Sequence, residues 1–473
     1  MKELTSKTFG AKKKLPIRVV QFGEGNFLRA FVDRIIQELN EHANFNAGVA
    51  IVQPIEQGMV GMLQKQDGLY HHIIKGTLNG KVIEGKKLIS CIERLVDPFE
   101  ELDAFLELAT IDTLALVISN TTEAGIEFDE NDRIPDKGLA KTFPGKLTQF
   151  LFKRFEHFNG DISKGLGIIP CELIDRNGDQ LKATVLEYSN LWNLPTEFIK
   201  WIQSANHFGN TLVDRIVPGF PKDNIHEIQH DLGYRDNLVV VSEAYYLWVI
   251  EGSRKLRELF PADQYGLNVK YVADQTPYRV QKVRILNGSH TCMVAIGLLQ
   301  GLKTIRETIM DDTVGPYVQQ MMFEEIIPTI DLPSEEVGQF AKDVIERFEN
   351  PFIRHELADI SLNSISKFKV RVLPSIEDYT AQKDRPPSKL CTAFAALIKL
   401  YTSSLDGEII ELRDSGEVID FFRSLTNKGY NGEQLVKAVL SNKAFWGKDI
   451  SENQQILAQV TQSLERINNG QIV

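Results

Sequence analysis

The chain has 473 residues, of which 64 are acidic and 53 basic, giving a formal net charge of −11 at pH 7. Hydrophobic residues at 43% and charged residues at 25% are typical of globular proteins, so the composition argues against disorder. The acidic balance argues against nucleic acid or an anionic membrane as the main partner and favours a small molecule. The length favours two domains over one.

Cysteine spacing and the lengths of the apolar runs indicate the cellular setting. Cys91, Cys171, Cys292 and Cys391 lie far apart and form no C-x-x-C pair, which favours neither a zinc site nor a disulfide framework. The N-terminal segment MKELTSKTFGAKKKLP has no apolar core of signal-peptide length, and no uninterrupted apolar run elsewhere approaches the length of a membrane span. We therefore expect a protein of the reducing cytoplasm.

Over the first half of the chain, short apolar runs alternate with amphipathic stretches, as in strand-helix-strand units around a mostly parallel sheet. Apolar residues from Phe27 to Leu39 recur at three- and four-residue spacing and predict one helix that packs on this sheet. The predicted fold class is α/β, with a doubly wound, Rossmann-like domain at residues 1–276. The predicted strands are 17–22, 48–53, 113–119, 166–170 and 238–242.

From about Pro277 onward, nearly every apolar stretch has helical periodicity, and strand patterns are almost absent. Pro261, Gly266 and Pro277 interrupt regular structure in the region before these helices. We therefore expect a mainly α-helical C-terminal domain at residues 277–473.

The segment QFGEGNFLRA, residues 21–30, follows the first predicted strand and begins the first predicted helix. Gly23 and Gly25 would let the backbone turn tightly and approach a pyrophosphate at the helix N-terminus. However, Leu28 stands where a G-x-G-x-x-G motif has its third glycine, and Glu24 places negative charge beside the proposed anion site. These residues alone leave open a dinucleotide-binding turn and a strand-to-helix bend without a ligand.

Two neighbouring positions give no clear indication of a dinucleotide. Arg29 lies one turn into the helix, where it can offset Glu24, contact a phosphate or point into solvent as most single arginines do. The second strand ends at Gln53, Pro54 and Glu56, without a plain acid for the adenosine ribose and without an arginine for NADP. The ribose-binding residue is therefore not assigned from the sequence.

A second group of polar residues lies in QKVRILNGSHT, on the first helix predicted after the domain boundary. On an α-helix, at about 100° per residue, Lys282, Asn287 and His290 fall within roughly 140° of one another and can face one site. Ketone reduction needs a proton donor, a dipole for the developing alkoxide and a group that fixes the substrate, and these residue types can supply them in turn. Each is also common without a catalytic role, so both interpretations stay open.

Both segments resemble motifs of the mannitol dehydrogenase family, the long-chain polyol dehydrogenases. Between them, SNTTEAGI, PCELIDRNG, LVDRIVPGFP and VSEAYYLWVIEG are similar to further family blocks, so the resemblance covers nearly the whole chain. It implies an NAD-dependent, metal-independent oxidoreductase with its site between a Rossmann-like and a helical domain. The sequences of these motifs most resemble those of family members that act on hexuronates. This resemblance implies a small-molecule sugar acid as the partner.

Residue by residue, the resemblance implies specific roles. Lys282 is the expected general acid of reduction, Asn287 is expected to polarise the carbonyl oxygen, and His290 is expected to hold a substrate hydroxyl so that the reacting carbon is oriented. NAD binding is expected in two segments, the second of which ends a strand near the nicotinamide half. The expected NAD-binding residues are Val19, Val20, Gln21, Phe22, Gly23, Glu24, Gly25, Asn26, Phe27, Leu28, Arg29, Ala30, Ser119, Asn120, Thr121 and Thr122.

The sequence departs from the family pattern near the expected oxyanion. Leu173 stands where mannitol-oxidising members have an asparagine that contacts the oxyanion. Asn177 can compensate as a substrate-binding residue, or the site can rely on Asn287 alone.

A second departure lies in the block NPFIRHELADISLNSISKF. Lys367 matches a family lysine, whereas Asp359 replaces a substrate-contacting arginine. A uronate carboxylate needs a cation or a cluster of N–H donors. Arg354, His355 and Lys367 are the candidates, although Arg354 is nearly as well explained as a surface charge.

Other functions stay open. The substrate can be a different ketouronate or a neutral polyol, and a non-catalytic NAD-binding sensor would keep the turn without the chemistry. A metal-dependent dehydrogenase is disfavoured because His71, His72 and the scattered carboxylates show no zinc-ligand spacing. The oligomeric state is not determined by the sequence.

Overall fold

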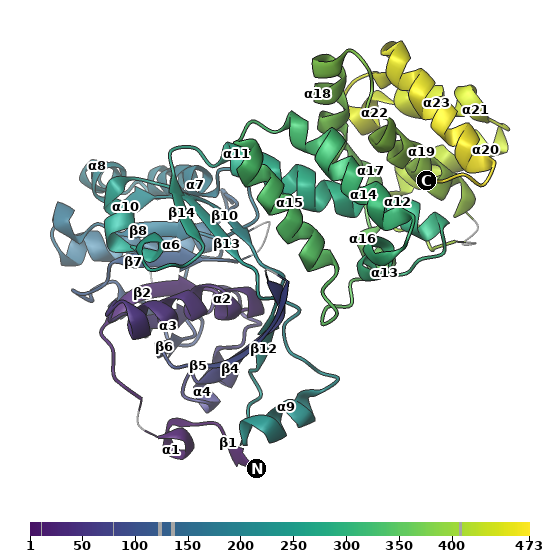
Figure 1. The fold of residues 1–473 in the computed structure, drawn as a ribbon. Coiled ribbons are helices and arrows are strands. Elements are labelled where there is room, and N and C mark those ends of the chain that lie inside the picture. The colour runs from purple at the N-terminus through teal and green to yellow at the C-terminus, as the bar shows by residue number, and fades with distance from the viewer. Residues whose placement is uncertain (11, 79, 122–124, 134–137, 406–408) are drawn as a thin grey trace. The chain divides into compact units, whose positions relative to one another are not determined.

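A computed structural model describes residues 1–10, 12–78, 80–121, 125–133, 138–405 and 409–473 (Figure 1). The chain divides into two compact units, which we call the sheet unit and the helical unit. The sheet unit comprises Met1–Lys75 and Val82–Gln275, and the helical unit comprises Gly76–Lys81 and Thr276–Val473.

The sheet unit is built around a six-stranded parallel sheet. Its strand order, β6-β3-β2-β7-β8-β9, is that of a doubly wound dinucleotide-binding fold, and the order reverses between β2 and β7. In such sheets, ligands bind outside the carboxyl ends of the strands at this reversal. The strands are β2 (Ile17–Phe22), β3 (Gly48–Val52), β6 (Ile92–Val96), β7 (Leu116–Ser119), β8 (Gly167–Pro170) and β9 (His207–Phe208).

Both faces of the sheet are covered, because successive residues of the buried strands point to opposite sides. Val19 packs in one apolar core with Ile35 of α3, while Val20 packs in a second core with Phe150 of α6. The helices of this unit are α1 (Ser6–Phe9), α2 (Asn26–Ala30), α3 (Val32–His42), α4 (Val60–Lys65), α5 (Leu102–Leu108), α6 (Phe143–His157), η1 (Ile162–Lys164), α7 (Asn177–Leu191), α8 (Thr196–Ala205), α9 (Ile225–Leu232), α10 (Arg254–Leu259) and η2 (Ala262–Gln264).

Three smaller sheets complete the sheet unit, and only one of their strands was expected. The strand predicted at 238–242 is present as β12, but it pairs with β4 outside the six-stranded sheet. The sheets are β1 (Lys2–Glu3) with β11 (Tyr234–Arg235); β12 (Val240–Ser242), β4 (Tyr70–Leu78) and β5 (Lys81–Ile89); and β10 (Asn210–Asp214), β13 (Leu247–Glu251) and β14 (Val269–Val272).

The helix predicted from Phe27 to Leu39 is divided into α2 and α3. Phe31 stands between them with φ −114° and ψ −72°, outside the usual helical values. Phe31 is fully buried, and its ring centroid lies 5.2 Å from that of Trp248. The apolar pattern continues across the break because apolar residues of α2 and of α3 belong to the same core.

The helical unit contains helices in all its described segments from residue 276 onward, and the mixed α/β prediction is confirmed. Helix α19 forms its centre, because Leu390 to Leu400 is almost continuously buried. The helices are α11 (Thr276–Gln281), η3 (Lys282–Asn287), α12 (Gly288–Leu299), α13 (Ile305–Met310), α14 (Val314–Gln320), η4 (Met321–Ile326), η5 (Ile327–Thr329), α15 (Ser334–Phe348), α16 (Leu357–Ile360), α17 (Ser364–Arg371), α18 (Leu373–Lys383), α19 (Ser388–Ser403), α20 (Gly416–Asn427), α21 (Gly432–Leu440), α22 (Lys443–Trp446), η6 (Ile450–Glu452) and α23 (Gln454–Asn468).

The four cysteines are buried and unpaired, so none of them forms a disulfide. Burial raises the pKa of each of these thiols. Among the described helices, none combines the length and the apolar character that crossing a membrane requires.

A buried polar cluster lies beside α3. The hydroxyl oxygen of Tyr70 is 2.8 Å from Asp33 Oδ2 and 3.0 Å from the carbonyl oxygen of Arg29. One hydroxyl proton cannot serve both acceptors, but a protonated Asp33 can donate to Tyr70 while Tyr70 donates to Arg29. Burial raises the pKa of Asp33 to about 7, which agrees with a protonated carboxyl group below neutral pH.

The substitution Asp33→Asn should flatten the pH dependence of stability. Asp33 binds its proton more tightly in the folded protein than in the unfolded chain, so its contribution is complete below about pH 4 and is lost as the pH rises to about 7. The wild-type free energy of unfolding should therefore fall by up to roughly 1.4 kcal/mol per pH unit over this range. Asparagine keeps a donor for Tyr70 and does not ionise.

Urea unfolding of both proteins from pH 5 to pH 8 measures this difference. Asp103→Asn, at an exposed position of α5, is the matched control and should keep the wild-type slope. Equal slopes for Asp33→Asn and the wild type would contradict the prediction.

Candidate dinucleotide and catalytic site

The turn after β2 lies at the reversal of strand order. Gly23 has a φ of +118°, and a Cβ atom there would lie 2.8 Å from the carbonyl oxygen of Asn120, so a side chain does not fit. Gly25 is exposed, and a Cβ atom there would meet nothing within 4 Å. The backbone at Gly25 is therefore open to a ligand, as the approach of a phosphate requires.

Only part of the segment from Val19 to Ala30 is exposed to a ligand. Five of its side chains belong to the apolar cores and support the turn without facing solvent: Val19, Val20, Phe22, Leu28 and Ala30. Gln21 is also buried, and its Nε2 donates to the carbonyl oxygen of Gly23 at 3.0 Å. Phe27 is partly buried, whereas Gly25 and Asn26 are exposed.

Arg29 is buried, with 1% of its surface exposed, so the interpretation of a solvated arginine is wrong. Its guanidinium donates to the carbonyl oxygens of Glu24 (3.1 Å) and Leu238 (2.6 Å) and to Asn26 Oδ1 (2.7 Å). It also lies over the ring of Tyr70, 5.1 Å from its centroid. With its nitrogens engaged in this way, Arg29 clamps the turn, and the expectation of a coenzyme contact is corrected to a supporting role.

Polar side chains of the turn after β2 and of the carboxyl ends of β3 and β6 make hydrogen bonds that the sequence did not predict. Glu24 is buried, and its Oε1 accepts a hydrogen bond from the backbone N–H of Met59 at 2.9 Å. Burial raises the pKa of Glu24, and its hydrogen bond from Met59 opposes the increase. Gln53 Nε2 donates to Asp97 Oδ2 at 3.1 Å. The carboxylate of Asp97 therefore lies at this edge of the sheet, although Asp97 is distant in sequence from Gln53.

The carboxyl ends of β7 and β8 are joined by the buried carboxylate of Glu172. Ser119 Oγ donates to Glu172 Oε2 at 3.1 Å, while the backbone N–H and the hydroxyl of Thr121 donate to Oε1 at 3.0 and 3.1 Å. Burial raises the pKa of Glu172, and these hydrogen bonds oppose the increase. Sequence reasoning missed this role, although Glu172 follows a strand directly beside the one that ends at Ser119. Thr122 lies outside the described residues.

Asn177 does not take the substrate-binding role expected of it. It is fully buried, and its Nδ2 lies within 3.2 Å of the carbonyl oxygens of Pro170, Glu172 and Thr211. Its Oδ1 accepts hydrogen bonds from the N–H groups of Gly178 and Thr211. Because both ends of the amide are engaged by backbone, Asn177 is a structural residue that joins β8, α7 and β10.

Asn120 makes a related connection on the adjacent strand. Its Nδ2 donates to the carbonyl oxygen of Cys171 at 2.6 Å, and its backbone N–H donates to the carbonyl oxygen of Phe22. Asn120 therefore links the ends of β2, β7 and β8. The segment expected near the nicotinamide is held in place by its neighbours on both sides.

In the helical unit, the segment from Lys282 to Asn287 is a π-helix, so the assumption of a regular α-helix is wrong. Residues five apart are hydrogen-bonded neighbours in a π-helix, which places Lys282 and Asn287 one turn apart. His290 follows Asn287 by three residues of α-helix, nearly one further turn. The wider turn aligns the three residues better than the roughly 140° spread of an α-helix. Such segments occur frequently at functional sites.

The three residues differ in exposure. Lys282 and Asn287 are partly buried, whereas His290 is 8% exposed. The His290 ring centroid lies 4.5 Å from that of Phe348 and 5.1 Å from that of His355, and its Nε2 has no hydrogen-bond partner in the described part of the chain. Burial lowers the pKa of His290 well below its usual value, and nearby cations lower it further, so the ring is neutral near pH 7.

The three candidates for a carboxylate site lie in different settings. Arg354 is exposed and forms an ion pair with Glu356, so its interpretation as a surface charge is the better one. His355 is partly buried beside His290, and burial lowers its pKa. Lys367 Nζ donates to the carbonyl oxygen of Ile360 at 2.8 Å, and burial lowers its pKa.

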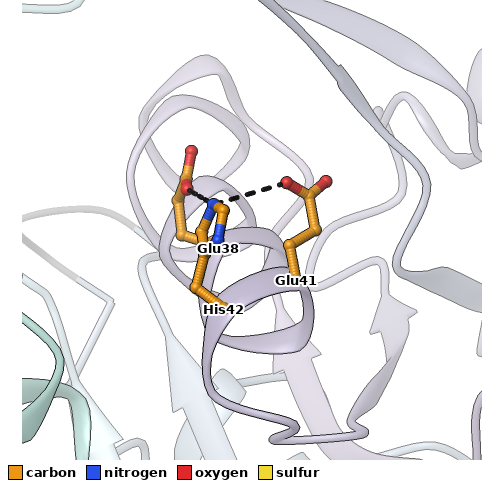
Figure 2. Close-up of side chains that lie close together, drawn as sticks. All are labelled: Glu38, Glu41 and His42. Atoms are coloured by element: carbon orange, nitrogen blue, oxygen red, sulfur yellow. Dashed lines mark ion pairs between the residues drawn. The ribbon is translucent and has the colours of Figure 1, made fainter.

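A separate group with metal-ligand chemistry lies on the exposed face of α3 (Figure 2). Glu38, Glu41 and His42 bring their side chains within 4.8 Å of one another. Arg34 lies 2.6 Å from Glu38, and Lys87 contacts both glutamates. Because these cations already neutralise the carboxylates, the group is better explained as a surface ion-pair network.

The doubly wound sheet, the glycine turn at the strand reversal and the separate helical unit define a dehydrogenase with a Rossmann-type domain. Residues 17–260 match the family model for the mannitol dehydrogenase Rossmann domain, and residues 274–468 match the model for the mannitol dehydrogenase C-terminal domain. The chain belongs to the mannitol dehydrogenase family. The predicted family and the predicted oxidoreductase class are thereby confirmed.

Curated relatives match almost the full length of the chain. The altronate oxidoreductase of Bacillus subtilis strain 168 is 44% identical over 470 residues, which cover 99% of this chain and 96% of that protein. The altronate oxidoreductase of Phocaeicola vulgatus is also 44% identical, over 99% of this chain and 97% of that protein. The altronate oxidoreductase of Yersinia enterocolitica is 42% identical over 96% of this chain and 94% of its own length.

Solved structures show the same fold at low sequence identity. D-sorbitol dehydrogenase in substrate-free form has a TM-score of 0.78 at 19% identity and covers 97% of this chain and 94% of its own. The ternary complex of Pseudomonas fluorescens mannitol 2-dehydrogenase with NAD and D-mannitol has a TM-score of 0.67 at 20% identity, over 97% and 93%.

Glu172→Gln should destabilise the sheet unit. The new amide keeps one acceptor oxygen and turns the other into an N–H₂ donor, so at least one of the charge-assisted hydrogen bonds from Ser119 and Thr121 is lost, at a cost of roughly 1–3 kcal/mol. Chemical unfolding followed by circular dichroism measures this loss. Glu187→Gln, at an exposed position of α7, is the matched control and should be neutral. A Glu172→Gln protein as stable as the wild type would contradict the proposed connection.

Proposed function

We propose that this protein is an NAD-dependent oxidoreductase of the cytoplasm that interconverts D-tagaturonate and D-altronate. This proposal rests mainly on the 42–44% sequence identity to altronate oxidoreductases from several bacteria over nearly the whole chain. The partner is a small sugar acid. The net charge of −11 disfavours a polyanion such as nucleic acid as the main partner. Four unpaired cysteines support a reducing compartment.

The sheet unit suits NAD. The open backbone at Gly25 and the exposed Asn26 offer room for the pyrophosphate, and Ser119 to Thr121 end the strand on the other side of the reversal. Gln53 at the end of β3 offers no cation for the extra phosphate of NADP. When bound, NAD supplies a hydride acceptor for oxidation and, as NADH, a hydride donor for reduction.

Lys282 provides the proton of the proposed reaction. In reduction, the protonated amine of Lys282 donates to the carbonyl oxygen as that oxygen gains negative charge. The side-chain amide of Asn287, one π-turn away, donates a hydrogen bond to the same oxygen and stabilises the developing alkoxide. In oxidation, the neutral amine of Lys282 accepts the proton from the substrate hydroxyl.

His290 positions the substrate in this proposal. Its ring is neutral and offers one donor and one acceptor nitrogen. The buried Nε2 has no partner among the described residues, and such a group costs roughly 1–3 kcal/mol when it stays unpaired. A hydroxyl of the bound sugar acid would satisfy this nitrogen and fix the orientation of the reacting carbon. His355, whose ring lies beside that of His290, and Lys367, whose charge acts on His290, are the further binding residues of this proposal.

The substrate assignment is tested by initial rates of NADH oxidation with purified protein. D-tagaturonate should give the highest kcat/KM when compared with D-fructuronate and D-fructose. A preference for fructuronate would identify a different ketouronate reductase, and a preference for fructose would identify a polyol dehydrogenase. Either preference would overturn the proposed substrate while leaving the family membership intact.

Lys282→Ala should abolish turnover without preventing coenzyme binding. Loss of the proton donor should lower kcat for tagaturonate by about 10²- to 10⁴-fold. The Kd for NADH, measured by fluorescence titration, should stay within about twofold of the wild type. Lys303→Ala, an exposed lysine of the same unit, is the control and should retain wild-type kcat. Retained turnover in Lys282→Ala would remove the lysine from the mechanism, and a protein that binds NADH but reduces no ketose would favour a sensor.

A further inference from the structure

Arg371 is fixed against the helix that carries the proposed catalytic residues. It ends α17, and the start of α12 packs tightly on it: a Cβ atom added to Gly288 would lie 3.0 Å from the carbonyl oxygen of Arg371. Gly288 directly follows Asn287. A larger residue at position 288 would push the two helices apart, so the glycine permits this close approach.

The guanidinium of Arg371 reaches the neighbourhood of His290. Its Nη1 lies 3.5 Å from the hydroxyl oxygen of Thr291, at the long limit of a hydrogen bond. Thr291 in turn donates to the carbonyl oxygen of Asn287 at 2.9 Å. The side chain of Arg371 is therefore placed one helical turn from Asn287 and beside the residue that follows His290.

Arg371 has no carboxylate partner among the described residues, whereas several other arginines of the helical unit do. Arg284 pairs with Asp378, and Arg423 pairs with Asp420. No carboxylate of the described residues lies within ion-pair distance of Arg371. A guanidinium has five N–H donors in a planar fork, and within the described part of the chain only one of them is directed at a protein acceptor.

The surroundings of Arg371 are positive and partly dry. Arg371 is half-buried, and burial lowers its pKa, although an arginine stays charged at neutral pH. Lys367 lies four residues earlier on α17, on the same face. The positive charge of Arg371 contributes to the lowered pKa of both Lys367 and His290. An anion placed here would relieve this repulsion.

We propose that Arg371, supported by Lys367, binds the carboxylate of the sugar acid, a role that rests on the proposed ketouronate substrate. The guanidinium fork matches a carboxylate with two parallel hydrogen bonds. Thr291 follows Asn287 by four residues, a rise of about 6 Å along an α-helix. In an extended ketouronate, about four carbon–carbon bonds, or roughly 5 Å, separate the ketone carbon from the carboxylate carbon. A substrate with its ketone oxygen at Asn287 therefore brings its carboxylate to Arg371.

The test is Arg371→Gln in the full-length protein. The KM for D-tagaturonate should rise by about 10- to 100-fold, because a charge-assisted, bidentate contact is lost. The kcat should change by less than about fivefold, and the Kd for NADH by less than about twofold. Arg371→Lys keeps the charge without the planar fork and should give an intermediate KM. Arg423→Gln, an exposed arginine of α20, is the matched control and should behave as the wild type.

The outcomes separate the two proposals. If the wild type reduces tagaturonate and a folded Arg371→Gln protein has an unchanged KM, the carboxylate assignment is overturned while the proposed function stands. If the loss falls on kcat and NADH affinity together, Arg371 is a structural residue and the assignment is again wrong. Should Arg371→Gln fail to fold, Arg371→Lys decides by the same KM criterion. A wild type that does not reduce tagaturonate overturns the proposed function itself, and the assignment falls with it.

Discussion

The buried carboxylate of Glu172 sets the shape of the coenzyme edge of the sheet. Parallel strands end side by side, and their last carbonyl and N–H groups have no further strand to bond. Glu172 accepts hydrogen bonds from Ser119 and Thr121 on the neighbouring strand end, and Asn177 fastens the next strand to the helix that follows it. This fixed edge keeps Asn120 against Gly23, where no side chain fits. The glycine turn is thus determined by a neighbour about one hundred residues away as well as by its own sequence.

In the proposed function, the two units divide the requirements of hydride transfer. The sheet unit supplies backbone and small residues that suit a phosphate-bearing coenzyme. The helical unit supplies an amine, an amide and an imidazole in a line along one helix, together with cations on the adjacent α17. Acid–base chemistry needs side chains of defined polarity, whereas dinucleotide binding needs chiefly an accessible backbone. The two kinds of site therefore arise from different types of secondary structure.

Local patterns predicted the fold well because they depend on nearby residues. The buried strand at Ile17 to Phe22 and the apolar face that ends at Leu39 are visible in the spacing of apolar side chains alone. The smaller sheets escaped prediction because strands such as β4 carry His71 and His72, whose partners, Asp236 and Ser242, are distant in sequence. Their burial depends on tertiary contacts that no local window contains.

Several candidate site residues make contacts in the fold that the sequence did not predict. Arg29 resembles a solvated helix residue in sequence, yet it is buried because three acceptors converge on it in the fold. Asn177 was expected at the substrate and instead fastens backbone segments. Arg371 was overlooked, although its spacing of four residues from Lys367 places both cations on one helical face. Counter-ions are a property of the folded chain, so the sequence could not show that Arg371 has none among the described residues.

The π-helix between Lys282 and Asn287 makes the arrangement of these residues sensitive to the length of the helix. A π-turn holds about one residue more than an α-turn. Removing that residue would let the helix rewind into regular α-form without unfolding its ends. Everything before the deletion would rotate by about 100° relative to α12. Lys282 would then no longer lie on the helix face that it shares with Asn287 and His290. The alignment of these three residues therefore depends on the length of this helix.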